Sequence, residues 1–294
     1  MNVLSGNRGR RLLLAGALYL LYALVTLAFL TGVVGKRVVA APVFSPYQAS
    51  LPSAAVKTRL TRALVASRAN ATGAAQPQGL RLPDLEILDP YDIHTVGSQE
   101  TGDLRLKFGT MIWNAGAGPL ETRGAQNPET KRLEVYQYLY PQGGGEARRG
   151  RRIGTFDYNH RHGHLHLQTF ARYQLWSLGP RGEPEEAVAT NDKVGFCLMD
   201  ITPVDQERRN AASAPVYAGC RADVQGISVG YGDEYVAQLF EQDLDITNLP
   251  DGNYALVTTT NPDREIVEAG YGNNTSAVMI ALKGGALAPY PLEL

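Results

Sequence analysis

Four histidines alternate with other residues in the segment YNHRHGHLHLQ, as His160, His162, His164 and His166. The chain has five histidines, so nearly all of its imidazole lies within seven residues. Successive side chains of a strand point to opposite faces, so this spacing predicts four imidazoles on one face, ~6.6 Å apart along the strand. Two of them can bind one metal ion, and a twist or curl of the strand would bring a third. The segment therefore predicts a metal site.

Imidazole ligands without a nearby thiolate are typical of Cu(II), Zn and Fe sites. The Irving–Williams order favours copper where copper is available, but spacing alone does not choose among the three metals. A row of surface histidines is the alternative. Leu165 and Leu167 alternate with the histidines and are expected to pack into the core from the opposite face, which would hold the ligand strand rigid.

The first 41 residues differ from the rest of the chain. Leu12–Val34 carries no charge and as a helix would span ~34 Å, enough to cross a bilayer. Arg8, Arg10 and Arg11 precede it, which predicts an N-terminus in the cytoplasm. A cleaved signal peptide is the alternative, although a signal sequence usually has a shorter apolar run. Either way the rest of the chain is expected to be extracytoplasmic, membrane-anchored or secreted.

The remainder divides into a linker and one domain. Residues 42–80 are rich in Ala, Ser, Pro, Gln and Asn and are expected to form a stalk, with one helix at Ser53–Arg68. Residues 81–294 contain many short apolar runs broken by turn signals, and the run LRLKF (104–108) alternates like a half-buried strand. We therefore predict a mainly β fold, an antiparallel β-sandwich with irregular loops.

Cys197 and Cys220 are the two cysteines of the chain. In an exported protein such a pair is expected to form a disulfide, and two free buried thiols are the alternative.

Charge argues against nucleic acid as a partner. The formal net charge is −1 and no long basic stripe occurs, so the chain lacks the signature of a nucleic-acid-binding protein. The short run RRGRR (148–152) is expected to lie in a solvated hairpin loop.

His162, His164 and His166 resemble the H-x-H-x-H copper motif of the lysyl oxidases. His160 is an additional histidine to which this resemblance assigns no role. Other segments resemble that family in the same order, and the likeness covers about residues 82–283. They are Asp192–Asp200, around the cofactor-forming lysine of the family; Gln225–Tyr235, ending in its cofactor-forming tyrosine; Asp245–Thr247; Gly252–Tyr254; and Tyr271–Asn274.

The resemblance implies a reaction. Copper and O2 would oxidise Tyr235 to a quinone, and the neutral amine of Lys193 would add to it to form lysine tyrosylquinone. Burial lowers the pKa of a lysine and would supply that neutral amine. Primary amines would then be converted to aldehydes with release of ammonia and hydrogen peroxide, and Asp233 is the candidate base.

The resemblance also implies a calcium site that ties an N-terminal Pro-Asp-Leu segment to the loop before the last strand. Gly270 stands where the family has an aspartate, which removes one charged ligand, and a loop capped by asparagine side chains is the alternative. The matching oxygen donors are Asp84, Leu85 by its carbonyl oxygen, Glu268, Asn273 and Asn274.

The chain lacks most of the cysteines of animal lysyl oxidases, and Cys197 and Cys220 match one bridge of that set. Two other functions remain open on the sequence: a non-catalytic envelope protein that binds copper or zinc, and a metal-dependent hydrolase. Small amines and protein lysine are both compatible substrates, and the composition and the anchor suggest a prokaryotic envelope protein.

Overall fold

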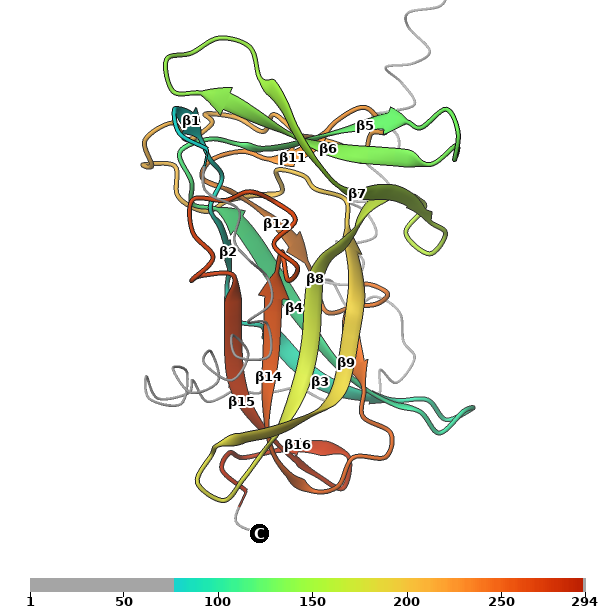
Figure 1. Cartoon of the computed structure of the whole chain (residues 1–294). Coiled ribbons are helices and arrows are strands. Elements are labelled where there is room, and N and C mark those ends of the chain that lie inside the picture. The colour runs from blue at the N-terminus through green and yellow to red at the C-terminus, as the bar shows by residue number, and fades with distance from the viewer. Residues whose placement is uncertain (1–76, 293–294) are drawn as a thin grey trace, which may run out of the picture. The chain divides into compact units, whose positions relative to one another are not determined.

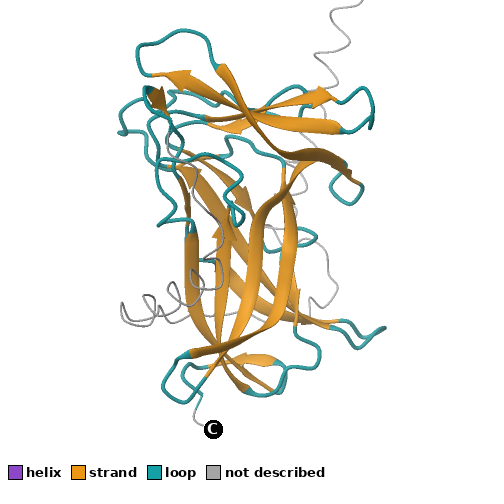
Figure 2. Ribbon diagram, in the orientation of Figure 1, coloured by secondary structure: helices purple, strands orange, loops and turns teal. Residues whose placement is uncertain are grey.

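A computed structural model describes residues 77–292, and every element in that range is a strand (Figures 1 and 2). The mainly β prediction is therefore confirmed for this part of the chain. The strands are β1 (Leu80–Arg81), β2 (Leu85–Ile87), β3 (Tyr91–Gly97), β4 (Leu104–Asn114), β5 (Leu120–Gln126), β6 (Leu133–Pro141), β7 (Arg148–Asn159), β8 (His164–Leu178), β9 (Pro184–Phe196), β10 (Thr202–Pro203), β11 (Gln225–Ile227), β12 (Tyr231–Tyr235), β13 (Asp243–Asp245), β14 (Gly252–Thr260), β15 (Thr275–Lys283) and β16 (Ala286–Ala288).

The strands form two sheets in which all strand pairs are antiparallel. The ten-stranded sheet runs β11-β5-β6-β7-β8-β14-β15-β16, with β1 on β6 and β9 on β8. The six-stranded sheet runs β10-β12-β4-β13, with β2 and β3 also on β4. Strands β7 and β8 join the upper part of the larger sheet to its lower part (Figure 1).

The main core lies between the two sheets. Phe108 of β4 meets Tyr173 of β8 edge to face, with 5.0 Å between the ring centroids. Leu106 and Phe108 are fully buried and Leu104 packs against the same cluster, as the alternation of LRLKF predicts. Leu167 is buried in this core and Leu165 packs against it, so the predicted inner face of the histidine strand is confirmed.

The segment from His164 to Leu178 forms one continuous strand, β8, whose register with β9 shifts near Thr169. The chain leaves the sheet after Phe196, the last residue of β9. There the buried Asp200 carboxylate accepts hydrogen bonds from the backbone N–H groups of Val216 and Ser228, so a side chain holds the neighbouring loops together where no strand does.

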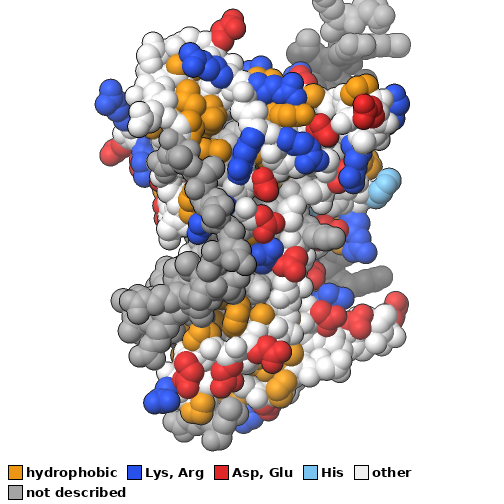
Figure 3. Space-filling model, viewed as in Figure 1, with side chains coloured by type: hydrophobic (Ala, Val, Ile, Leu, Met, Phe, Trp, Pro, Cys, Tyr) orange, Lys and Arg blue, Asp and Glu red, His pale blue; other side chains and the backbone are white. Residues whose placement is uncertain are grey.

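The prediction of a loop for RRGRR was wrong, because these residues begin β7. Tyrosines at alternate positions of β6 each lie beneath a guanidinium group, and one of these groups, that of Arg149, belongs to this run. Figure 3 shows Lys and Arg side chains beside hydrophobic ones on this part of the molecule. The pairs are Arg149 with Tyr136 at 3.5 Å, Arg123 with Tyr138 at 4.1 Å and Arg81 with Tyr140 at 5.8 Å.

Within residues 77–292 no helix is long and apolar enough to cross a membrane. The expected anchor at Leu12–Val34 and the expected stalk helix at Ser53–Arg68 lie outside the described residues.

Truncation of Phe108 tests the core between the sheets. We expect Phe108→Ala to lower the free energy of unfolding by about 3–5 kcal/mol, because a fully buried aromatic side chain is replaced by a cavity. Urea denaturation followed by circular dichroism would measure the loss. Val96→Ala, at an exposed position of β3, is the control and should change stability by about 0.5 kcal/mol or less. Equal effects of the two substitutions would contradict this account of the core.

Candidate functional site

The histidines occupy a hairpin, and the prediction that all four share one strand was wrong. His164 and His166 lie in β8, whereas His160 and His162 lie in the turn that follows β7. The side-chain oxygen of Asn159 accepts hydrogen bonds from the backbone N–H groups of Arg161 and His162, at 2.9 and 3.1 Å. This turn directs the chain back on itself and brings His162 to the two strand histidines.

His162, His164 and His166 form one cluster in which a ring nitrogen of each lies within 4.8 Å of the others. The ring of His162 is 4.9 Å from that of His166, which in turn is 4.9 Å from that of His164. His160 is separate: it is exposed and its ring packs edge to face on Tyr158. The structure therefore brings three of the four histidines together.

Burial favours the neutral form of two of the clustered imidazoles, His164 and His166. Desolvation, and then the neighbouring His162 and His164, lower the pKa of His166 to about 3, and burial also lowers the pKa of His164. Among the described residues, Nε2 of His164 and both ring nitrogens of His166 are buried without a hydrogen-bond partner. His162 Nε2 lies 3.1 Å from the carbonyl oxygen of Phe240, which favours a proton on Nε2 and leaves Nδ1 with a lone pair.

These observations fit a divalent transition-metal ion. Buried polar atoms ordinarily have a partner, and unpaired ring nitrogens on adjacent imidazoles are what a metal ion requires. The cluster contains imidazole nitrogens alone, a donor set suited to copper, zinc or iron. A second group, His164 with Cys197 and Cys220, has its sulfur atoms in a disulfide, so these sulfurs are not thiolate ligands.

Tyr235 lies against the histidine cluster. It ends β12, in the six-stranded sheet, opposite Thr110 of β4. Its ring centroid is 6.1 Å from that of His162 and 6.2 Å from that of His166. The ring also stacks on Phe196 of β9 at 3.9 Å. Strands from both sheets thus fix the position of this phenol.

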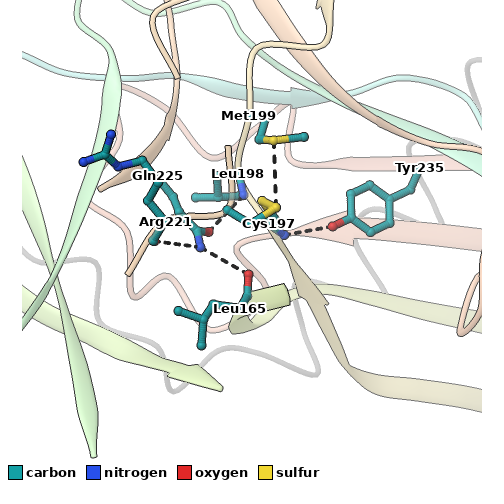
Figure 4. The surroundings of a disulfide bond; sticks show 8 residues. Leu165, Cys197, Leu198, Met199, Arg221, Gln225 and Tyr235 are labelled. Carbon is teal, nitrogen blue, oxygen red and sulfur yellow. Dashed lines mark hydrogen bonds between the residues drawn. A yellow bond between two sulfur atoms is a disulfide. The ribbon is translucent and has the colours of Figure 1, made fainter. Parts of the chain in front are cut away.

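The phenol of Tyr235 is buried and held by one hydrogen bond. The backbone N–H of Cys197 donates to its hydroxyl oxygen at 2.8 Å, as Figure 4 shows. Burial raises the pKa of Tyr235 above its usual range, Asp233 adds to the rise, and the Cys197 N–H opposes it. Tyr235 is therefore a neutral phenol at physiological pH.

The predicted disulfide between Cys197 and Cys220 is confirmed. It adjoins the site, because Cys197 also supplies the N–H that holds Tyr235. The side chain of Gln225, the first residue of the segment Gln225–Tyr235, makes three hydrogen bonds beside it (Figure 4). It donates to the carbonyl oxygens of Leu165 and Arg221 and accepts from the Leu198 N–H. The start of β11 is therefore tied both to the loop after β9 and to the histidine strand, β8.

Lys193 lies in β9, three residues before the Phe196 that stacks on Tyr235. Its side chain lies outside what the structure describes. The pairing of β9 with β8 shifts by one residue between Asn191 and Val194, so the backbone at Lys193 belongs to a β-bulge. Bulges re-aim the side chains next to them, and they occur often near functional sites.

Asp233 precedes Tyr235 by two residues in β12, so the two residues share a face of the strand. It is fully buried, and neither carboxylate oxygen has a well-aligned hydrogen bond within the described residues. Burial raises the pKa of Asp233 well above its usual range, with only a partial offset from the backbone amide of Met199. Burial therefore favours the protonated form of this carboxyl group.

Three polar side chains, those of Gln242, Thr110 and Tyr173, form a hydrogen-bonded chain that begins at the backbone carbonyl of Tyr235. None of them was identified from the sequence. The Gln242 amide donates to the Tyr235 carbonyl oxygen at 3.0 Å and to the Thr110 hydroxyl at 2.9 Å. That hydroxyl lies 3.1 Å from the hydroxyl of Tyr173. A Gln in a loop and a Thr in a strand are ordinary residues, so only their proximity in the fold identifies them.

A cavity of about 450 Å³ opens beside the histidine cluster. It is lined by His166 at its inner end, by Val194 and Gly195 directly after Lys193, and by His160 and Glu241 among others. A Cβ atom on Gly195 would come within 3.0 Å of the His166 Cβ, so glycine permits this close approach of β9 to β8. The cavity therefore gives a small molecule access to the region between the cluster and β9.

The residues proposed for calcium are also adjacent. Glu268 is fully buried and accepts hydrogen bonds from the Leu85 N–H at 2.5 Å and from the Asn274 side chain at 2.8 Å. Burial raises the pKa of Glu268 to about 8. Asp84 Oδ1 and Asn274 Oδ1 are buried without a hydrogen-bond partner in the described residues. The backbone carbonyl oxygen of Asn273 accepts a hydrogen bond from the Ile87 N–H, which joins this loop to β2.

This cluster fits a cation only in part. Two orphaned oxygens and a buried carboxyl suit Ca²⁺. However, the Asn274 and Asn261 amide groups donate to Glu268, as the alternative of an asparagine-capped loop predicts. A Cβ on Gly270 would lie 3.5 Å from Asp84 Oδ1, so a larger acidic residue there would reach the cluster. The site lacks that charge.

The sequence profile described as lysyl oxidase matches residues 120–288, more than half of the chain. Protein-lysine 6-oxidase of Rattus norvegicus is 30% identical over 207 residues, which cover 69% of this chain and 47% of the relative. The protein of that name from Homo sapiens is 31% identical over 197 residues, covering 66% and 44%. Lysyl oxidase homolog 4 of Homo sapiens is 34% identical over 116 residues, covering 39% and 14%.

The fold and the site define a two-sheet β domain in which three imidazoles face a buried tyrosine between the sheets. The chain belongs to the lysyl oxidase family. It spans about half the length of the protein-lysine 6-oxidase from Rattus norvegicus.

Removal of one clustered imidazole tests the metal site. We expect His166→Ala to weaken copper binding by more than about 100-fold, since even changes outside the ligand shell can cost 10–100-fold. Equilibrium dialysis with a competing chelator would measure the affinity. His160→Ala is the matched control, because His160 lies in the same hairpin outside the cluster. Equal loss in both variants would contradict the three-histidine site.

The raised pKa of Glu268 predicts a pH dependence of stability. A carboxyl group whose pKa is higher in the folded chain binds more protons when folded, so its contribution is lost as pH rises from 4.5 to about 8. In a chelator we therefore expect the melting temperature of the wild type to fall across this range more steeply than that of Glu268→Gln. Calcium at pH 8 should raise the melting temperature of the wild type alone. Parallel slopes would contradict the titration, and no calcium effect would contradict the cation site.

Proposed function

We propose that this protein is a copper-dependent amine oxidase that converts primary amines to aldehydes, ammonia and hydrogen peroxide with O2. Family membership supports this activity at the level of the family. The observation that carries the proposal is the placement of the buried phenol of Tyr235 against His162 and His166. A site for metal storage alone has no need of such a phenol, and a hydrolase has no use for its oxidation.

His162, His164 and His166 would hold the copper ion. Their neutral rings and unpaired nitrogens favour binding without prior loss of a proton. When bound, Cu(II) with O2 supplies the one-electron oxidation chemistry that an unaided phenol beside it lacks. The preference for copper over zinc rests on the affinity order of imidazole sites.

Tyr235 and Lys193 would together become the cofactor, lysine tyrosylquinone. Tyr235 is held for this role by its stacking on Phe196 and by the Cys197 N–H, which fix the ring and its oxygen. Lys193 belongs to the strand that carries Phe196, and it directly precedes Val194 and Gly195, which line the cavity.

Asp233 would serve as the base. Its burial makes the protonated form the resting state, so it must lose its proton before it can accept one from substrate carbon. The carboxyl group shares a strand face with Tyr235, which places it on the side where the cofactor would form.

The substrate would enter through the cavity of about 450 Å³ that ends at His166. This volume suits a small amine or one lysine side chain. The relatives are named for oxidation of protein lysine, and we propose primary amines of either kind as substrates.

We further propose that Ca²⁺ binds at Asp84, Glu268 and Asn274 and ties β2 to the loop before β15. We also propose that the domain is extracytoplasmic, anchored in the membrane or secreted. The disulfide supports this location, because disulfides form and persist in oxidising compartments.

Peptide mass mapping tests the proposed cofactor. After expression with copper and O2, we expect a covalent peptide pair joining Lys193 to Tyr235, together with reaction of the protein with a hydrazine. Lys193→Ala and Tyr235→Phe should each abolish the cross-link and lower oxidase activity by more than about 1,000-fold, because a covalent catalyst is lost.

Tyr231→Phe is the control, since Tyr231 is a buried phenol of the same strand that lies outside the ring contacts of the cluster. It should keep both the cross-link and the activity. Recovery of the Lys193 and Tyr235 peptides unlinked from copper-loaded wild type would remove the quinone proposal and favour a copper-binding protein. Hydrolysis supported by zinc without O2 would favour a hydrolase.

A further inference from the structure

One acidic side chain, Glu241, lies among the described residues that line the cavity. It belongs to the segment 236–242, which leads from Tyr235 to β13. The same segment carries Phe240, whose carbonyl oxygen contacts His162 and whose ring is largely exposed. The Glu241 carboxylate therefore reaches the cavity on the segment that directly follows Tyr235, the proposed cofactor tyrosine.

Glu241 is held in place from two sides. Its Oε2 accepts a hydrogen bond from the Asn159 side chain at 2.9 Å, and its backbone carbonyl accepts one from the Asn191 side chain at 3.3 Å. Asn159 also shapes the histidine turn. Within the described residues no lysine or arginine forms an ion pair with this carboxylate, which keeps Oε1 for another partner.

Arg161 is the cationic residue of the described lining, but it does not neutralise Glu241. Its guanidinium lies 5.6 Å from the centre of the Phe240 ring. Arg161 and Glu241 are both exposed, so water and salt screen the attraction between them, whereas a hydrogen bond to the carboxylate acts at short range.

From this arrangement we infer that Glu241 binds an ammonium group of the substrate and makes the site selective for amines that carry a second positive charge. The inference rests on the proposed oxidase function. Primary amines are cationic at neutral pH, and a carboxylate forms a charge-assisted hydrogen bond with such a group.

The selectivity follows from what one nitrogen can do. The nitrogen that reacts must be neutral to add to a carbonyl. The single nitrogen of a monoamine therefore leaves Glu241 as it reacts. A diamine reacts through one nitrogen while the other stays protonated on the carboxylate. The class of substrate is thus an α,ω-diamine, or a lysine side chain next to another cation.

Steady-state kinetics with 1,5-diaminopentane and pentylamine test this inference, because the two amines differ only in the second amino group. We expect wild type to prefer the diamine in kcat/KM. Glu241→Gln should raise KM for the diamine about tenfold, since an uncharged amide replaces the charged partner, and should reduce the preference for the diamine over pentylamine. Added salt should raise KM for the diamine in wild type more than in the variant.

Glu129→Gln is the matched control, because it removes the same charge from an exposed turn between β5 and β6. It should leave the preference intact. Titration with phenylhydrazine, which is neutral, should give equal quinone content in all three proteins. Wild type that carries the quinone but shows no preference, or oxidises neither amine, overturns the inference, as does a diamine preference that survives in Glu241→Gln. Wild type without hydrazine reactivity overturns the proposed function itself, and this inference with it.

Discussion

The site depends on a contact between the two sheets. Tyr235 comes from the smaller sheet and the imidazoles of His164 and His166 from the larger one, and they meet where the sheets pack. Neither sheet by itself could place the phenol beside the histidine cluster. Phe196 completes the contact by stacking on the phenol from β9. Packing of the core and assembly of the site are therefore a single event, since the rings that form the site also fill the space between the sheets.

Burial has the same consequence for each titratable group of this contact: it favours the neutral form. His166 is kept free of protons, whereas Asp233 and the Tyr235 phenol are kept protonated. A neutral imidazole has a lone pair with which it can bind a metal ion. Unpaired buried polar atoms cost stability, and the histidine cluster and Asp233 carry several of them. That cost is typical of a site preorganised for a ligand.

Long loops surround the sheets, and a few polar links fix those that matter to the site. The disulfide and Gln225 hold the segment after β9, and through the Cys197 N–H they hold the Tyr235 hydroxyl. Glu268 performs a similar task at the other loop cluster, joining β2 to the segment before β15. Glu241 reaches the cavity on a loop as well. Loops can supply such groups because a rigid sheet anchors both of their ends.

The sequence by itself determined the chemistry and the class of fold. The histidine concentration, the alternating apolar runs and the cysteine pair each depend on local residue types, so the imidazole cluster, the strands and the disulfide were predictable. Only the tertiary structure decided which groups meet. It separated His160 from the cluster, because a turn interrupts the expected strand there, and it placed RRGRR in a strand, where Arg149 lies over Tyr136 of the neighbouring strand. It also brought Gln242 and Glu241 to Tyr235 and the cavity. Such contacts join segments through packing between the sheets, and side-chain types read along one chain carry no record of that packing.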